Sequence, residues 1–139
     1  MNICRQYLFA GFVALAAMGA LATPALADKS GEVRTYVDNQ LASNYAAREI
    51  GKNCPSIRAV ESKIGSAAMG MKKSLKAKGY SKAEINSGLK GVKLNGGKAA
   101  GQAMVQQMGA KPGDAASYCA VGEKEISQKT FIGSVLKKK

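Results

Sequence analysis

Two cysteines, Cys54 and Cys119, set the strongest constraint on how this chain folds, because they stand 65 positions apart. An even pair of cysteines in an exported chain, far apart in sequence and each near a predicted helix end, indicates a structural disulfide. Closing a loop of this length constrains the unfolded chain by roughly 4 kcal/mol in the chain-entropy model. We therefore predict a Cys54–Cys119 bond that ties the junction of the first two helices to the start of the last.

Export is predicted from the first 27 residues. Arg5 is their only charged residue, an apolar run follows, and an A-x-A pattern ends at Ala27, as is typical of a signal-peptidase site. The alternative is a membrane anchor, but the apolar run of about 15 residues is short of the roughly 20 that cross a bilayer. We expect the signal peptide, residues 1–27, to be removed together with Cys4. A single helical domain, residues 28–139, would then reach the periplasm.

Apolar residues recur at helical spacing along this domain, and no segment shows the alternation of a strand. A first helix is predicted from Ser30 to about Lys52, and Pro55 favours the first turn of a second. Ser81 and Glu84 form the capping box of a third helix. The second helix is the clearest, with apolar residues at steps of three and four: Ile57, Val60, Ile64, Ala68, Met71 and Leu75.

The glycine-rich stretch near residues 95–97 predicts a break before helicity resumes. Asp114 can cap a last helix, which we expect to run as far as Leu136. The resulting fold class is all-α, a small bundle of about four helices closed by one disulfide. Small residues are predicted to let its helices approach closely: Ala68, Gly70, Gly88 and Gly122.

Positive charge is concentrated in the middle of the chain. The whole sequence has a net charge of +12, and residues 63–98 hold nine lysines with Glu84 as their sole acid. One interpretation is a solubilising helix face. The functional interpretation is an anion-binding surface comprising Lys72, Lys73, Lys76, Lys78, Lys82, Lys90, Lys93 and Lys98.

The composition of this lysine-rich segment narrows the class of partner. It contains no arginine, and Tyr80 is its sole aromatic residue, so it lacks the guanidinium forks and stacking platforms that read nucleic acid specifically. An anionic membrane surface or an envelope protein partner fits mobile lysines better.

Known catalytic and cofactor patterns are missing. The chain has no histidine, and its two retained cysteines are distant, so ligands for zinc or copper are lacking. No C-x-x-C spacing supports a redox site. Ser87–Lys90 and Ser134–Lys137 match S-x-x-K without the companion motifs of serine acyl-enzymes. Residues 91–98 resemble a phosphate loop, but neither register supplies both its lysine and its hydroxyl. We expect no enzyme activity, cofactor, metal or nucleotide.

Four sets of short sequence blocks, taken together, resemble a known protein family. In these blocks the chain resembles a family of small exported alphaproteobacterial proteins known only as a domain of unknown function, and the resemblance extends from about Ile50 onward. It implies an all-helical exported domain and supplies no catalytic residues. The glycine and lysine enrichment of residues 86–101 departs from the family pattern. The blocks are Asn53–Ile57, Lys78–Ser81 with Glu84–Ile85, Tyr118–Gly122 with Glu125–Ile126, and Ile132–Gly133 with Leu136.

Two functional hypotheses follow. The first is a non-enzymatic periplasmic interaction or accessory protein that acts through its basic surface. The second is a small periplasmic chaperone or stress protein whose methionines, if exposed, offer adaptable apolar contacts. The alternative for these methionines is plain packing in the core. They are Met69, Met71, Met104 and Met108.

Overall fold

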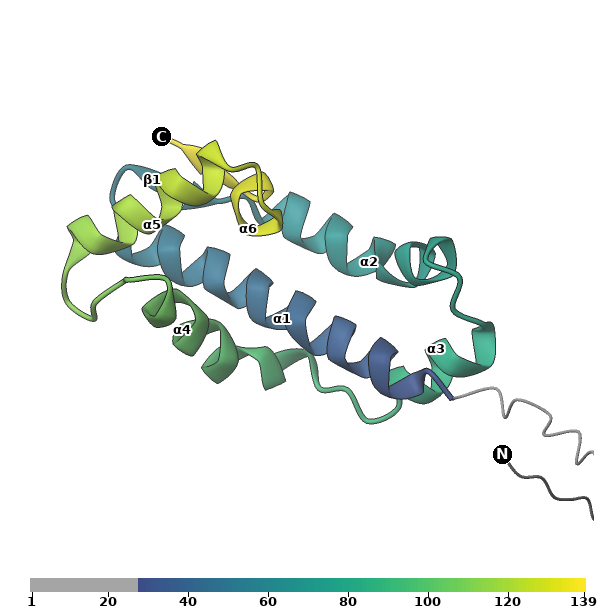
Figure 1. Cartoon of the computed structure of the whole chain (residues 1–139). Helices are drawn as coiled ribbons and strands as arrows, with labels where there is room; N and C mark the ends of the chain where they lie inside the picture. The colour runs from purple at the N-terminus through teal and green to yellow at the C-terminus, as the bar shows by residue number, and fades with distance from the viewer. Residues whose placement is uncertain (1–27) are drawn as a thin grey trace, which may run out of the picture.

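One long helix, α1, runs through the middle of the fold and contacts every other helix (Figure 1). The computed structural model describes residues 28–139, so the predicted signal peptide, residues 1–27, lies outside the described residues. The elements follow in the order α1 (Ser30–Asn53), β1 (Ile57–Ala59), α2 (Glu61–Ala77), α3 (Lys82–Leu89), the 3-10 turn η1 (Leu94–Gly96), α4 (Gly97–Gln107), α5 (Ala115–Ser127), α6 (Phe131–Ser134) and β2 (Leu136–Lys138).

The predicted all-α class is confirmed in its main feature, because helices dominate the described chain. Two details were wrong. The described part has six α-helices instead of about four, and a short two-stranded sheet joins the segment between α1 and α2 to the residues that follow α6.

Two hydrophobic cores lie along α1, one toward each of its ends. The distal core, near the start of α1, gathers side chains from α1, α2 and α3: Val33, Val37, Leu41, Met71, Leu75 and Ile85. The disulfide core, near the end of α1, is the larger one and gathers Ala46, Ala47, Ile50, Cys54, Ile57, Ile64, Val105, Ala110, Tyr118, Val121, Ile132, Val135 and Leu136. Burying one such large apolar side chain contributes about 1.5–3 kcal/mol.

The predicted disulfide is present and lies in the larger core. Cys54 directly follows α1, its amide donates to the Ile50 carbonyl 2.8 Å away, and its side chain is 1% exposed. Cys119 lies in α5, and the two Cα atoms are 5.0 Å apart. The bond therefore joins the end of α1 to the beginning of the α5–β2 region, as the sequence predicted.

The predicted start of the second helix was wrong. Ile57–Ala59 is a strand that pairs antiparallel with Leu136–Lys138, and α2 begins only at Glu61. Ile57 is buried while Arg58 is exposed, which is the alternation of a strand. Three residues are too few for this period to be distinguished from helical spacing in the sequence.

The predicted last helix was also wrong in its extent. It begins after Asp114, whose side chain accepts from two backbone amides, but it ends at Ser127 instead of Leu136. Lys129 then adopts a positive φ of 52°, which stops the helix. Thr130 accepts from the Gly133 amide and so caps the separate short helix α6.

Glycines mark the closest approaches to α1. A Cβ on Gly97 would lie 2.7 Å from the Leu41 carbonyl carbon, and a Cβ on Gly101 would lie 2.7 Å from the Ala42 carbonyl oxygen. Gly88 and Gly122 also pack tightly, as predicted, whereas a Cβ on Gly70 would meet nothing within 4 Å, so that prediction was wrong. The predicted break is found, because η1 separates α3 from α4.

Reducing the disulfide should lower the free energy of unfolding by about 4 kcal/mol, because a bond across 65 positions restricts the unfolded chain. Urea unfolding followed by far-UV circular dichroism, with and without reductant, measures this. The C54A/C119A variant is the control and should not respond to reductant. An unfolding midpoint of the native chain that reductant leaves unchanged would contradict the pairing.

Gly101→Ala should destabilise the fold by about 2 kcal/mol although alanine favours helix, because its methyl group would overlap Tyr45 and Ala42 of α1. Gly70→Ala, in open space on α2, is the matched control and should stabilise by up to about 1 kcal/mol. Thermal unfolding of both variants checks the difference. A gain of stability in Gly101→Ala would show that α4 is not in close contact with α1.

Candidate binding site on helix α2

The eight lysines of the predicted basic surface are all exposed. None forms an ion pair with another residue of the 28–139 segment. Lys72, Lys73 and Lys76 lie on α2, Lys78 caps its end and Lys82 opens α3, so these five belong to adjoining elements at the distal end. Lys90 and Lys93 flank the α3–α4 connection, and Lys98 lies on α4, which packs on α1 away from α2 (Figure 1).

An exposed methionine lies among three of these lysines. Met69 is 80% exposed, and it is the one large hydrophobic side chain among the described residues that is exposed to solvent. Lys72, Lys73 and Lys76 follow it at steps of three, four and seven residues, which places all four side chains on one face of α2. We call these four residues the outer face of α2.

The other three methionines considered for a chaperone surface all pack against a core. Met71 is 9% exposed and belongs to the distal core, while Met104 and Met108 are partly buried against the disulfide core. Of the four, only Met69 is largely exposed.

A groove follows the seam between α1 and α2. Its larger hollow, of about 280 Å³, is lined by Leu41, Asn44, Tyr45, Arg48, Ile64, Gly65 and Ala68. Its smaller hollow, of about 140 Å³, is lined by Val37, Leu41, Ala68, Met71, Lys72, Leu89 and Val92. Because the two hollows share Leu41 and Ala68, we treat them as one α1–α2 groove. A Cβ on Gly65 would meet nothing within 4 Å, so the missing side chain helps to keep the groove open.

One residue that lines this groove has a buried side-chain oxygen without a partner. Asn44 is 3% exposed and lines the larger hollow, and its Oδ1 atom accepts no hydrogen bond. Buried polar atoms are nearly always paired, so an orphaned amide oxygen calls for an explanation. Sequence reasoning missed this residue, although its step of seven from Val37 places an amide on the apolar face of α1.

An ion pair closes the end of the groove nearest the disulfide core. Arg48 of α1 donates through Nε at 3.0 Å and through Nη2 at 2.8 Å to the Glu61 carboxylate of α2. Its guanidinium also lies 5.3 Å from the centroid of the Tyr45 ring. These hydrogen bonds raise the pKa of Arg48 and lower the pKa of Glu61. Sequence reasoning missed this pair, because its members are separated in the chain by the end of α1 and by β1.

One hydrogen bond between elements, a capping box and a cation–π contact stabilise the distal end of the fold. The Tyr80 hydroxyl donates to Glu32 of α1 at 3.0 Å, and this bond raises the pKa of Tyr80. The predicted capping box is present, and the backbone amide of Ser81 lowers the pKa of Glu84. Lys78 lies 5.4 Å from the centroid of the Tyr36 ring, so this lysine leans over α1 and does not extend the outer face of α2.

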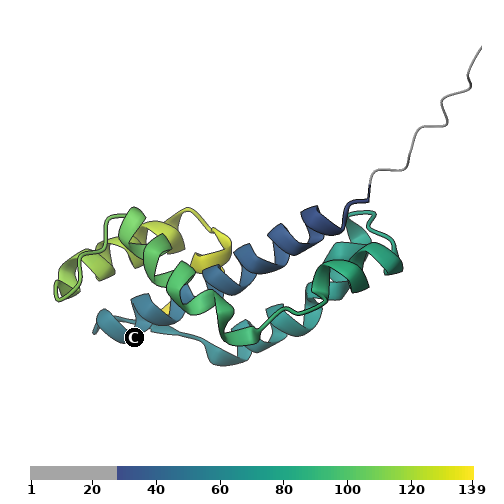
Figure 2. The ribbon, with the colours of Figure 1, turned by 90° about the horizontal axis from the view of Figure 1, so that it is seen from below.

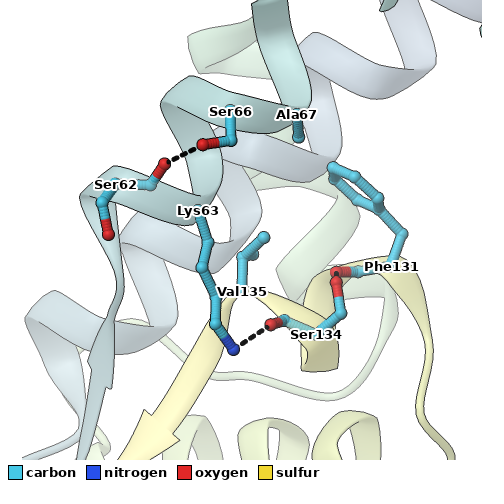
Figure 3. A pocket seen from close by; sticks show the side chains of 7 residues that line it. All are labelled: Ser62, Lys63, Ser66, Ala67, Phe131, Ser134 and Val135. Atoms are coloured by element: carbon cyan, nitrogen blue, oxygen red, sulfur yellow. Dashed lines mark hydrogen bonds between the residues drawn. The ribbon is translucent and has the colours of Figure 1, made fainter. Parts of the chain in front are cut away.

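A further hollow lies between α2 and α6 (Figure 3). Lys63 donates to the Ser134 backbone carbonyl at 2.9 Å across it, and Phe131 forms one wall. The Ser134 hydroxyl donates to the Phe131 carbonyl, whereas Lys137 lies on β2. The S-x-x-K spacing at Ser134 therefore falls across a helix end and a strand, not within one helical turn.

The glycine-rich stretch of residues 91–98 does not form a phosphate loop. It consists of an irregular segment, η1 and the start of α4, and it follows the helix α3 instead of a strand. Together with Arg34 and Asp38 of α1 it lines an open hollow of about 500 Å³. The Arg34 Nε donates to Asp38 at 2.9 Å, so this hollow has a neutral ion pair on one wall.

Comparison with protein families returned a match. A family of unknown function, DUF5333, matches residues 30–137. The chain belongs to this family. Comparisons with curated proteins and with solved structures returned no match. Family membership agrees with the resemblance seen in the sequence, while export and an alphaproteobacterial origin remain predictions.

Two kinds of feature are absent from residues 28–139. None of the helices in this range combines the length and the apolar composition that a membrane span requires. The same range contains no group of three or more histidine, cysteine, aspartate or glutamate side chains placed to hold a metal ion.

Asn44→Leu should raise the free energy of unfolding by about 1–2 kcal/mol, because it removes an unpaired buried amide and adds apolar surface beside a groove with room for it. Asn39→Leu, an exposed asparagine on the same helix, is the control and should change stability by less than about 0.5 kcal/mol. Urea unfolding distinguishes them. Equal effects of the two substitutions would show that the Asn44 amide carries no penalty.

Proposed function

We propose that this protein is an exported, non-enzymatic interaction protein that docks on an anionic membrane surface through the outer face of α2. The observation that carries the proposal is Met69, exposed among three lysines that have no ion-pair partner in the described chain. An apolar side chain flanked by lysines suits the boundary between lipid headgroups and acyl chains.

The expected strength of this contact is modest. Each lysine close to an anionic bilayer contributes about 1 kcal/mol, and insertion of Met69 adds about 1.5–3 kcal/mol. A total of about 5 kcal/mol corresponds to a dissociation constant of order 0.1 mM. The protein would therefore associate reversibly and in a salt-dependent manner, as a peripheral accessory protein does.

Export is supported by two independent features. The N-terminal pattern is that of a signal peptide, and disulfides persist in oxidising compartments such as the periplasm. The Cys54–Cys119 bond lies in the main core, where a reduced pair would leave the fold without its covalent closure. These features support a periplasmic location for the docking function.

The chaperone alternative has less support. It requires several exposed methionines, and of the four that were considered only Met69 is largely exposed, while Met104 and Met108 are partly buried against the disulfide core. A single methionine surrounded by lysines fits a charged surface better than an unfolded apolar client.

Replacing Lys72, Lys73 and Lys76 together by glutamine should weaken binding to phosphatidylglycerol vesicles at least tenfold, because about 3 kcal/mol of attraction is removed. Protein purified after expression of the full chain, in a vesicle sedimentation assay at low salt, provides the measurement. Met69→Ser should also weaken binding, and a high salt concentration should release the native protein.

The matched control carries the same loss of charge at other exposed lysines, Lys52, Lys111 and Lys124. This K52Q/K111Q/K124Q variant should bind within about threefold of the native protein if the outer face of α2 is the docking site. Equal losses of vesicle binding in both triple variants would show that binding depends on the net charge alone and not on the outer face of α2. No binding of the native protein to anionic vesicles would overturn the proposal, and capture of an envelope protein through the same lysines would replace the lipid by that partner.

A further inference from the structure

A second cationic surface lies on the short sheet, at the end of the fold that holds the disulfide core. Arg58 of β1 and Lys137 of β2 stand directly opposite each other in the antiparallel register. Both side chains are exposed, whereas Ile57 and Leu136 of the same strands are buried, so the two cations point away from the core. We call Arg58 and Lys137 the sheet face.

The sheet face has no anionic partner within residues 28–139. No ion pair joins either of its side chains to an acid of that range. Two acids on adjoining elements are already engaged, because Glu61 binds Arg48 and Glu123 binds Lys138. Like charges directly opposite each other on one face of a sheet are destabilising. An anion from outside the chain would relieve this repulsion, and the planar Arg58 guanidinium can bind a carboxylate through two hydrogen bonds.

The hollow between α2 and α6 adjoins the sheet face. This α2–α6 hollow has a volume of about 290 Å³, and its apolar lining consists of Ala67, Phe131 and Val135. In Figure 3 the half-buried Phe131 ring points toward Ala67 of α2. Lys137 follows Val135 by two residues, so their Cα atoms lie at most about 7 Å apart. One bound segment can therefore contact the hollow and the sheet face together.

The concave shape of the α2–α6 hollow distinguishes it from the outer face of α2. Met69 protrudes from the fold, as suits insertion into lipid, whereas a hollow receives a side chain from its partner. Lys63 lines the hollow and donates to the Ser134 carbonyl at 2.9 Å, and its ammonium group keeps further donors for an acceptor. A fitting partner thus combines one apolar side chain with neighbouring carboxylates.

We propose that the sheet face and the α2–α6 hollow bind an extended acidic segment of another protein. One aromatic side chain of that segment lies in the hollow against Phe131, and its carboxylates bind Arg58 and Lys137. An aromatic side chain fits best, because its contact with the Phe131 ring adds to the burial of its own surface. This surface uses the first two turns of α2 and the strand pair, so it is separate from Met69 and the three lysines of the outer face.

A synthetic peptide with one tryptophan between two runs of three glutamates tests the proposal. The chain contains no tryptophan, so the indole fluorescence comes from the peptide alone. Each run of glutamates extends about 10 Å from the tryptophan, which is enough to reach the sheet face from the hollow. One peptide should bind each native chain, and its emission should shift to shorter wavelength as the indole leaves water.

Two altered peptides separate the charge from the aromatic side chain. A peptide with glutamine in place of every glutamate should bind at least about tenfold more weakly, because it offers the sheet face no carboxylate. A peptide with serine in place of tryptophan should compete with the original peptide at least about tenfold more weakly, because nothing fills the hollow. Equal binding of the glutamine peptide and the original would overturn the role of the sheet face.

The R58Q/K137Q variant should weaken binding of the tryptophan peptide at least about tenfold. It should stay folded, because it removes a repulsive contact between two exposed side chains. The matched control, K72Q/K73Q, loses the same charge from α2 and should bind the peptide within about threefold of the native protein. Equal losses in the two double variants would show that the peptide responds to net charge, and would overturn the site.

Ala67→Leu fills the hollow and should weaken peptide binding at least about tenfold. Ala77→Leu is the matched control, because Ala77 is exposed at the other end of α2 and does not line the hollow, and it should leave the affinity unchanged. Equal affinity of these two variants, or no saturable fluorescence shift with the native protein, would overturn the placement of the aromatic side chain.

The acidic segment and the lipid surface are told apart by the same variants. R58Q/K137Q keeps Met69 and the lysines of the outer face, so it should sediment with phosphatidylglycerol vesicles as the native protein does, whereas K72Q/K73Q should lose vesicle binding and keep the peptide. Loss of vesicle binding in R58Q/K137Q, with no peptide binding by the native protein, would make the sheet face a lipid-binding surface and overturn the proposal.

Discussion

Close packing of the other helices on α1 is the constraint on which the rest of this fold depends. The elements that approach α1 most closely do so at glycines: Gly88 in α3, Gly97 and Gly101 in α4, and Gly122 in α5. A glycine inside a helix costs about 1 kcal/mol relative to alanine. Here that cost is offset by dispersion contacts with backbone and side-chain atoms of the neighbouring elements, which a Cβ would keep apart. Figure 2 shows the consequence from below, with α4 (green) crossing in front of α1 (blue) and packed against it.

Helix α2 does not follow this pattern. Its contacts with α1 are sparse, and Gly65 faces open space instead of a neighbouring backbone. The groove, the orphaned Asn44 oxygen and the exposed outer face all result from this looser placement. The Arg48–Glu61 ion pair ties α2 to α1 at one end, and Tyr80 and Glu32 link the chain that follows α2 to the start of α1. The helix is thus held at its ends and open along its middle.

Local signals in the sequence predicted the parts of the fold that depend on neighbouring residues. The Ser81–Glu84 capping box, the Asp114 cap and the long helix α1 were found in this way, and cysteine chemistry added the disulfide. The β1–β2 pairing was missed, because it depends on contact between residues about 80 positions apart and involves only three residues in each strand. The end of α5 was missed because a lysine with positive φ, not a glycine, stops it.

The features of the candidate sites also divide into those that the local sequence predicts and those that depend on tertiary packing. Exposure of the lysines followed from charge alone, but their separation among α2, α3 and α4 depends on tertiary packing. The role of Met69 could not be distinguished from those of Met71, Met104 and Met108, because the sequence does not show which side of each helix is covered. The sequence does not distinguish Asn44 from other helical residues, because its burial depends on the packing of α2 beside α1.

The two cores differ in how they are closed. The disulfide core has a covalent bond and a strand pair, whereas the distal core rests on six buried side chains and on surface hydrogen bonds. Local opening costs least where burial is smallest, so backbone amides of α3 and the end of α2 should exchange with solvent before those of α5. The end of the fold that carries the lysines would therefore open locally as a unit while the rest stays folded. The lysines of α2 are thus carried by the part of the fold that opens more easily, while the half closed by the disulfide stays rigid.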